Sequence, residues 1–396
     1  MWWSRGLLKH LPLSLGQYAP AFMDIMSDFT IDSTFIRLYY PSSTPNIEND
    51  ATKWIKWSPN EYYLQSMADL VSNWGTVLKA VLWLYGDVCL GEPHVPAMWE
   101  AEPMQSISKI PVIIFSHGFG ATRFLSSTIA IELASRGFIV ASIEHKDSSA
   151  CATYYYESPE KLEKDEKTWI PHEKMKFGPD HYKVRNTQLR GRANEIIKLI
   201  DFLHKINSGE ASNILKSSVD LSSFKDRLEL SSLSMMGHSF GGATSMLAMS
   251  LDDRIKYGII LDGWMFPLKE EDLVIKQPLI FINTQTFHIE SNIKVIEKYL
   301  NSNPAGVSRD IYTIKHTTHE SQTDTPHILG YWLNWFMPKL DPVVGTNINN
   351  HMILCFLHKN IGFPEFVTES ENYLKKEAES FVTGTIIYAK MPKRKL

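Results

Sequence analysis

The stretch Leu233-Ser234-Met235-Met236-Gly237-His238-Ser239-Phe240-Gly241-Gly242 decides the fold. Its first four residues read as a short buried strand, and a helical stretch follows its last glycine. Gly-x-Ser-x-Gly between a strand and a helix is the pattern of a nucleophile elbow. Glycines two positions either side of Ser239 leave room for the tight turn that such an elbow requires. The pattern therefore predicts that Ser239 projects a nucleophilic hydroxyl at the amino end of a helix, rather than lying in an ordinary glycine-rich turn.

The sequence around this motif alternates short apolar strands with helices. Because the strands lack in-out alternation, they are typical of a parallel sheet that is covered on both faces. The predicted fold class is α/β, an α/β-hydrolase fold with a mostly parallel central sheet and helices on both faces. We expect strands at 34–40, 110–115, 138–143, 233–236, 258–261, 279–283 and 311–315, and helices at 124–135, 184–206 and from about 240 and 290.

The domain organisation follows from this alternation. We expect a loosely structured lead-in at 1–30, one catalytic domain at 31–360, and a C-terminal extension with a basic tail at 361–396. Residues 157–181 are dense in Lys, Glu and Pro and read as a solvated loop. No internal repeat and no domain linker stands out.

Composition narrows the class of protein. The 396 residues are 44% hydrophobic and 21% charged, which fits a globular chain and excludes disorder, collagen and coiled coil as descriptions of the whole. A net charge of −4 supplies no general field for binding nucleic acid. Three scattered cysteines form neither a disulfide framework nor a metal cluster.

A serine nucleophile needs a base and an orienting acid, which in this fold follow it along the chain. Asp262 ends a predicted strand and is our candidate acid, although a strand-end cap is its alternative role. Asp252 and Asp253 compete, but they read as a pair that ends a helix. For the base, three histidines follow the last strand, and spacing alone leaves the choice open: His316, His319 and His327.

The oxyanion hole needs two backbone N–H groups, one from the residue after the serine and one from a loop after an early strand. These requirements point to Phe240 and to Phe119, which lies in the segment Ser116-His117-Gly118-Phe119-Gly120. The glycines there let the backbone approach a substrate oxygen.

With these motifs in place, the chain resembles the platelet-activating-factor acetylhydrolase family, calcium-independent phospholipases of the plasma and cytosolic types. The resemblance spans roughly residues 16–360 and implies a triad of Ser239, Asp262 and His319, with Phe119 and Phe240 as oxyanion donors. One departure follows His319, where Glu320-Ser321-Gln322 replaces the glutamine, asparagine and phenylalanine usual in the family. The likeness is carried by 35–41, 115–120, 137–145, 152–155, 237–244 and 258–267.

Two apolar segments, 71–85 and 328–337, align with the family's interfacial helices, which implies that they reach lipid. Ordinary core helices are the alternative interpretation. A basic tail of Lys390, Lys393, Arg394 and Lys395 could add attraction to anionic lipid, or be disordered. The expected interfacial residues are Trp74, Leu78, Trp83, Tyr331, Trp332, Trp335 and Phe336.

Arg5, Lys9, His10 and Pro12 interrupt the amino-terminal apolar stretch, so we expect no signal peptide, and no apolar run reaches transmembrane length. The expected protein is cytoplasmic and peripherally membrane-associated, without an obligate protein partner, metal or cofactor. The predicted reaction is hydrolysis of the sn-2 acetyl or short or oxidised acyl ester of phospholipids. The alternatives are a general short-chain carboxylesterase and a non-catalytic lipid-binding relative.

Overall fold

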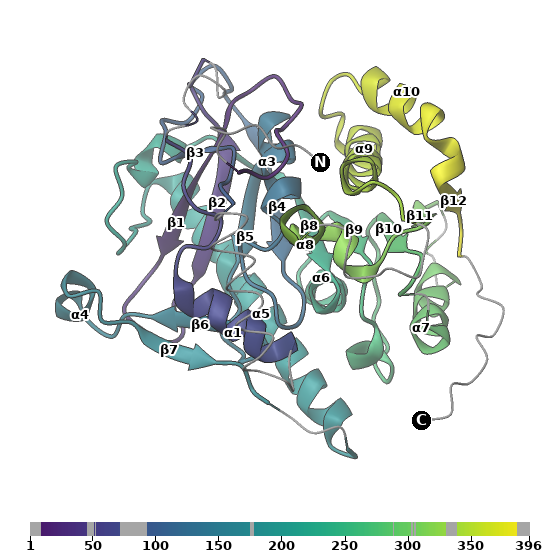
Figure 1. Ribbon diagram of the computed structural model, residues 1–396, viewed down its shortest axis with the longest axis horizontal. Coiled ribbons are helices and arrows are strands. Elements are labelled where there is room, and N and C mark those ends of the chain that lie inside the picture. Colours follow the sequence, from purple (N-terminus) through teal and green to yellow (C-terminus); the bar gives the residue numbers. More distant parts are fainter. Residues whose placement is uncertain are drawn as a thin grey trace.

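A computed structural model of the chain contains one large sheet with helices on both faces (Figure 1). It describes residues 9–45, 51, 53–71, 93–174, 178–287, 289–301, 304, 306–329 and 339–385. The strand order is β12-β11-β10-β9-β8-β4-β5-β2-β1-β3. Strands β11 to β5 in this order are parallel, whereas β2 and β12 join the two ends antiparallel. The strands are β1 (Pro20–Met26), β2 (Phe35–Pro41), β3 (Met98–Trp99), β4 (Ile110–Ser116), β5 (Ile139–Ile143), β8 (Leu228–His238), β9 (Tyr257–Leu261), β10 (Leu279–Thr284), β11 (Arg309–Ile314) and β12 (Phe381–Thr383).

The helices form two layers, one on each face of the sheet. Helices α5 to α7 pack in one apolar cluster and α3, α9 and α10 in the other, and Figure 1 shows α10 beside α9. This arrangement confirms the predicted α/β-hydrolase class. The helices are α1 (Glu61–Val71), α3 (Ser127–Ser135), α4 (Pro159–Glu163), α5 (His181–Ser208), α6 (Phe240–Leu251), α7 (Glu290–Asn301), α8 (Thr325–Leu329), α9 (Pro342–Ile361) and α10 (Thr368–Lys376).

Strand β4 shows why these sequences form central strands. Val112 and Ile114 point into the cluster with α5 and α6, while Ile113 and Phe115 point into the cluster with α3 and α9. Both faces of the strand are therefore buried, so a continuous apolar run is the sequence that it requires.

The expectation of a loosely structured lead-in at 1–30 is wrong for residues 20–26. These residues form β1, which is fully buried and pairs antiparallel with β2. Asp24 interrupts the apolar pattern of the strand, which hid it. Its carboxylate binds Arg37 (Nε to Oδ1, 2.7 Å) and Arg123 (Nη2 to Oδ2, 2.7 Å), so the charge is paired inside the core.

Two further segments carry more structure than expected. Residues 157–181 contain α4 and β7 (Thr168–Pro171), and β7 pairs with β6 (Ala152–Tyr155) in a second small sheet. Trp169 of β7 packs on the rings of Tyr63 and Tyr154, so this segment is not the solvated loop that its charge suggested. Beyond residue 360, α10 packs on α9, and β12 extends the main sheet.

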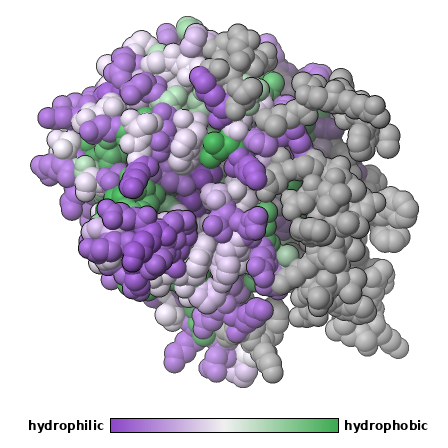
Figure 2. Space-filling model, turned by 60° about the vertical axis from the view of Figure 1, so that its left-hand side comes forward, coloured by the Kyte–Doolittle hydropathy of each residue, from purple (hydrophilic) through white to green (hydrophobic). Residues whose placement is uncertain are grey.

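On the face that Figure 2 presents, the described surface is mainly hydrophilic and its hydrophobic residues form small patches. None of the helices in the described ranges is long and apolar enough to cross a bilayer.

Candidate active site

Ser239 occupies a strained turn between β8 and α6. Its φ of 57° and ψ of −117° lie where residues with a side chain are rarely found. The flanking glycines make this turn possible. A Cβ on Gly237 would lie 2.1 Å from the carbonyl oxygen of Gly241, and one on Gly241 would lie 1.9 Å from that of Ser116. The close packing of β8, α6 and β4 therefore requires glycine at both positions.

Asp262 follows β9 and accepts three hydrogen bonds. His319 Nδ1 lies 2.6 Å from Oδ2, which also accepts from the Thr284 hydroxyl at 2.6 Å, and the Thr284 N–H donates to Oδ1 at 2.9 Å. Asp262 is buried, whereas the His319 side chain is 23% exposed. The hydrogen bond with Asp262 fixes the orientation of the imidazole ring and places its proton on Nδ1, the nitrogen that faces the carboxylate.

Backbone contacts bring this acid–histidine pair to Ser239. The Ser239 N–H donates to Leu261 O at 3.0 Å, and the Trp264 N–H donates to Ser239 O at 2.8 Å. The rings of His238 and His319 lie 4.6 Å apart, and Phe287 stacks on His319 at 3.8 Å. The serine, the acid and the histidine thus converge at the carboxyl edge of the parallel strands, where α/β folds bind ligands.

The competing residues lie elsewhere. Asp252 ends α6 and pairs with Arg254, as its reading as a helix end predicted. His327 contacts Thr346 Oγ1 at 3.0 Å, and the described contacts of His316 are made by its backbone, which binds Gln285 and Leu340. Of the three histidines, His319 is the one that binds Asp262.

The loop after β4 lies against the serine. A Cβ on Gly118 would be 3.1 Å from Ser239 Cβ, so this loop and the elbow are in direct contact. Phe240 is the first residue of α6, and its N–H is one of the donors that a helix start leaves without an intrahelical acceptor. Among the described residues, no carbonyl or side chain accepts from the Phe119 N–H. Both expected oxyanion donors therefore border the serine.

Sequence reasoning missed a second polar chain beneath this loop. Ser116 Oγ lies 2.8 Å from His145 Nε2, and His145 Nδ1 lies 2.5 Å from Glu195 Oε2. The order serine, histidine, carboxylate resembles a catalytic triad, but Ser116 and His145 are completely buried. A substrate therefore cannot reach Ser116. The hydrogen bonds from Ser116 to His145 and from His145 to Glu195 instead hold the loop after β4 in place. Polar residues at the ends of β4 and β5 were the signal that could have found it.

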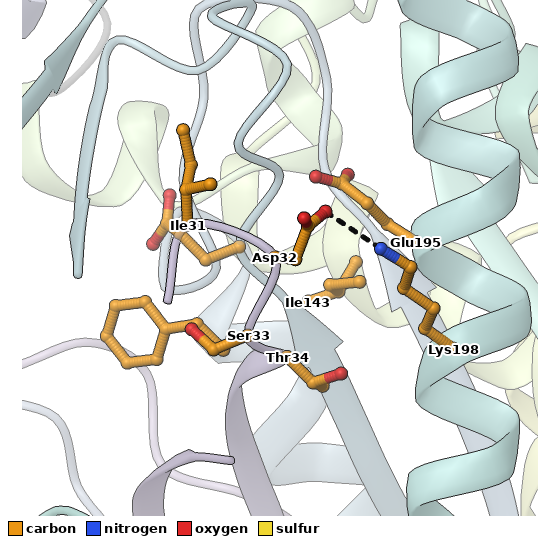
Figure 3. Close-up of a pocket in the computed structure, with 9 residues that line it drawn as sticks. Ile31, Asp32, Ser33, Thr34, Ile143, Glu195 and Lys198 are labelled. Carbon is orange, nitrogen blue, oxygen red and sulfur yellow. Dashed lines mark hydrogen bonds and ion pairs between the residues drawn. The ribbon is translucent and has the colours of Figure 1, made fainter. Parts of the chain in front are cut away.

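Figure 3 shows a pocket between the start of β2, the end of β5 and α5, and Glu195 is one of the residues that line it. An ion pair between Asp32 and Lys198, 2.9 Å long, crosses it. A second small hollow lies beside the acid and is lined by Asp262, Asn283, Phe287, Asn292, Ile293 and Ile296.

The residues expected to reach lipid lie outside the described ranges: Trp74, Leu78, Trp83, Tyr331, Trp332, Trp335 and Phe336. The same holds for the basic tail. Within the described ranges, no group of three His, Cys, Asp or Glu side chains could hold a metal ion.

Comparison with known proteins identifies the fold and the family of the chain. A solved ferulic acid esterase from Streptomyces cinnamoneus shares the fold, with a TM-score of 0.60 at 15% identity over 95% of this chain and 99% of its own. Platelet-activating factor acetylhydrolases of Bos taurus (35% identical; 95% of this chain, 83% of theirs) and Cavia porcellus (36%; 94% and 83%) are much nearer in sequence. A putative phospholipase A2 of Schizosaccharomyces pombe is 26% identical over 64% of this chain and 68% of its own. The model of the family "Platelet-activating factor acetylhydrolase, isoform II" matches residues 7–381, so the chain belongs to this family of carboxylic ester hydrolases.

Proposed function

We propose that the protein hydrolyses the sn-2 acetyl, short or oxidised acyl ester of phospholipids, with Ser239 as nucleophile and without calcium. The observation that carries the proposal is the 2.6 Å contact of His319 Nδ1 with Asp262, made beside a serine in a strained elbow. This is the arrangement that makes a serine hydroxyl reactive.

In the proposed cycle, His319 Nε2 takes the hydroxyl proton of Ser239 as the oxygen attacks the ester carbonyl. Asp262 stabilises the imidazolium that forms. The N–H groups of Phe119 and Phe240 donate to the oxyanion of the tetrahedral intermediate. As the intermediate collapses, the bond between the carbonyl carbon and the glycerol oxygen breaks, His319 gives its proton to that oxygen, and lyso-phospholipid departs. A water molecule, deprotonated by His319, attacks the acyl-enzyme, and His319 returns the proton to Ser239 Oγ as the carboxylate product leaves.

The substrate class is inferred from the relatives named platelet-activating factor acetylhydrolase, which match almost the full chain. A phospholipid must reach this site from an aggregate. We therefore also propose that the apolar segments 71–85 and 328–337 adsorb reversibly to membrane surfaces. Burying an aromatic or leucine side chain yields about 2–3 kcal/mol, so three or four such residues could offset the cost of adsorption.

The test is hydrolysis of phosphocholine lipids with an sn-2 chain that lengthens stepwise from acetyl, presented in liposomes with a calcium chelator. We expect fast release of acetate, a steep decline with chain length, and no turnover by Ser239→Ala. A soluble acetyl ester, assayed in parallel, separates this function from that of a general carboxylesterase. Preference for the soluble ester would overturn the phospholipase assignment.

A non-catalytic lipid-binding protein is the alternative of another class. Such a protein has no need of the Asp262–His319 hydrogen bond or of the strained Ser239. Liposome binding by a folded wild-type protein that hydrolyses no ester would favour it.

A further inference from the structure

Arg192, on α5, is a completely buried cation that touches both sides of the candidate oxyanion hole. Its Nη1 donates to His117 O at 2.6 Å and its Nη2 contacts Gly118 O at 3.4 Å. Its guanidinium carbon lies 4.4 Å from the centre of the Phe240 ring. One side chain therefore links the loop after β4 to the first residue of α6.

The other hydrogen bonds of the guanidinium are made with two side chains, those of Asp147 and Ser149. Nε donates to Asp147 Oδ2 at 3.1 Å and to Ser149 Oγ at 2.9 Å, and Nη2 donates to Ser149 Oγ at 2.6 Å. Both partners lie in the loop that follows β5. Burying a charge is costly, and an apolar side chain would fill the same space more cheaply. Unlike an apolar side chain, the guanidinium carries five N–H donors in one plane, and these fix the directions in which its hydrogen-bond acceptors lie.

The ring of His117 also donates to the carbonyl oxygen of Gly118. The backbone N–H of His145 donates to His117 Nε2 at 3.2 Å, so that nitrogen carries no proton. Burial and the nearby Arg192 hold the pKa of His117 well below its usual range, which keeps the ring neutral. The remaining ring proton is then on Nδ1, which lies 2.8 Å from Gly118 O and donates to it.

The direction of these bonds decides where the oxyanion donor points. Gly118 C=O and Phe119 N–H belong to one peptide group, and in a trans peptide they point in opposite directions. Gly118 O accepts from Arg192 of α5, from His117 Nδ1 and, at 3.3 Å, from the backbone N–H of Ala121. The Phe119 N–H, at the other end of the peptide group, therefore points away from these donors. They also polarise the peptide group, which strengthens that N–H as a donor.

We propose that Arg192 is a positioning residue for catalysis, which holds the Gly118–Phe119 peptide group so that the Phe119 N–H faces the oxyanion. The inference rests on the proposed function. It assigns no contact between Arg192 and substrate. The loss of this residue acts on the transition state, in which the oxyanion forms, and leaves ground-state binding nearly unchanged.

The experiment compares Arg192→Lys and Arg192→Gln with wild type on a soluble acetyl ester. Lysine can reach one carbonyl but cannot replace the fork, so we expect kcat to fall about 10-fold for Lys and about 10²-fold for Gln, the latter near the loss of one oxyanion donor. KM should change less than about threefold. The matched control is Arg190→Gln on the same helix, whose exposed side chain pairs with Glu271 at 2.5 Å. Its kcat should stay within about twofold of wild type.

A second readout separates positioning from a merely structural role. A trifluoromethyl ketone adds to the serine and places an oxyanion in the hole, so its inhibition constant should rise by the same factor by which kcat falls. Both readouts are taken on variants that keep a cooperative thermal unfolding transition, and Arg192→Lys carries the test if Arg192→Gln does not fold.

An unchanged kcat in folded Arg192→Lys would overturn the inference. A fall in kcat with no change in inhibitor affinity would overturn it as well. A wild type that hydrolyses neither the soluble ester nor an sn-2 acetyl phospholipid would instead refute the proposed function, so the two failures are distinguishable.

Discussion

Gly241 is the position at which one added methyl group should cost the most activity. In Gly241→Ala the new Cβ would lie 1.9 Å from the carbonyl oxygen of Ser116, 2.5 Å from its carbon and 2.9 Å from the oxygen of His117. All three atoms are backbone, so no side chain can rotate away. The contact can be relieved only if α6 and the end of β4 separate.

The size of this separation sets the expected effect. Ordinary carbon–oxygen contacts begin near 3.4 Å, so the two backbones must move apart by about 1.5 Å. Ser116 and His117 lead directly into the loop that holds Phe119, whereas α6 holds Ser239. A misplacement of about 1 Å costs roughly 10²-fold in rate, and overpacking typically costs about 1–3 kcal/mol of stability. We therefore expect kcat to fall at least about 10²-fold, with a loss of about 3 kcal/mol in the free energy of unfolding.

The assay combines ester turnover with urea unfolding of the same preparations. Gly345→Ala is the matched control, because its Cβ would meet nothing closer than Thr317 Cγ2 at 3.6 Å and its position is helical. That variant should keep wild-type turnover, and its free energy of unfolding should rise by about 0.5–1 kcal/mol. Full activity in folded Gly241→Ala would refute the proposed packing of the elbow against the loop.

Three further predictions concern charged groups. Asp262→Asn should lower kcat about 10³–10⁴-fold with little change in fold, as pH–rate profiles and circular dichroism would show, because an amide does not hold His319 in the required tautomer. Asp24→Asn should cost about 3–5 kcal/mol in urea unfolding, since buried Arg37 loses its ion pair and Arg123 keeps only the one with Glu144. Asp32→Asn at an exposed ion pair should cost less than about 1 kcal/mol. Burial lowers the pKa of His351 to about 4, so the unfolded chain protonates first and stability is lost as pH falls from about 6.5 to 4. His351→Gln should reduce that loss by up to about 2 kcal/mol, and an unchanged pH dependence would contradict this account.

The sequence predicts the parts of the site that follow directly from strand ends. Ser239, Asp262 and the loop of Phe119 each come immediately after a buried strand, and parallel strands bring their carboxyl ends to one edge. The base was harder, because three histidines follow β11 and only the conformation of the loop decides which one meets Asp262. That conformation depends on contacts such as the stacking of Phe287 on His319, which no local pattern encodes.

The features that the sequence did not reveal involve buried charge. Asp24 broke the apolar pattern of β1, because periodicity cannot show that Arg37 and Arg123 neutralise it. Arg192 lies in the predicted helix 184–206, and helical periodicity does not distinguish a buried arginine from a solvated one. Besides Asp147 and Ser149, its partners are the backbone carbonyls of His117 and Gly118, which have no signature in the sequence. Pairings of this kind become visible only when distant segments are placed together.

Covalent labelling of Ser239 tests the central claim most directly. A fluorophosphonate reacts only with a serine that an adjacent base activates, and peptide mass spectrometry identifies the modified residue. We predict stoichiometric labelling of Ser239 in wild type, protection by an sn-2 acetyl phospholipid, and no labelling of Ser239→Ala. Absence of label on folded wild-type protein, or label on another residue that persists in Ser239→Ala, would contradict the account.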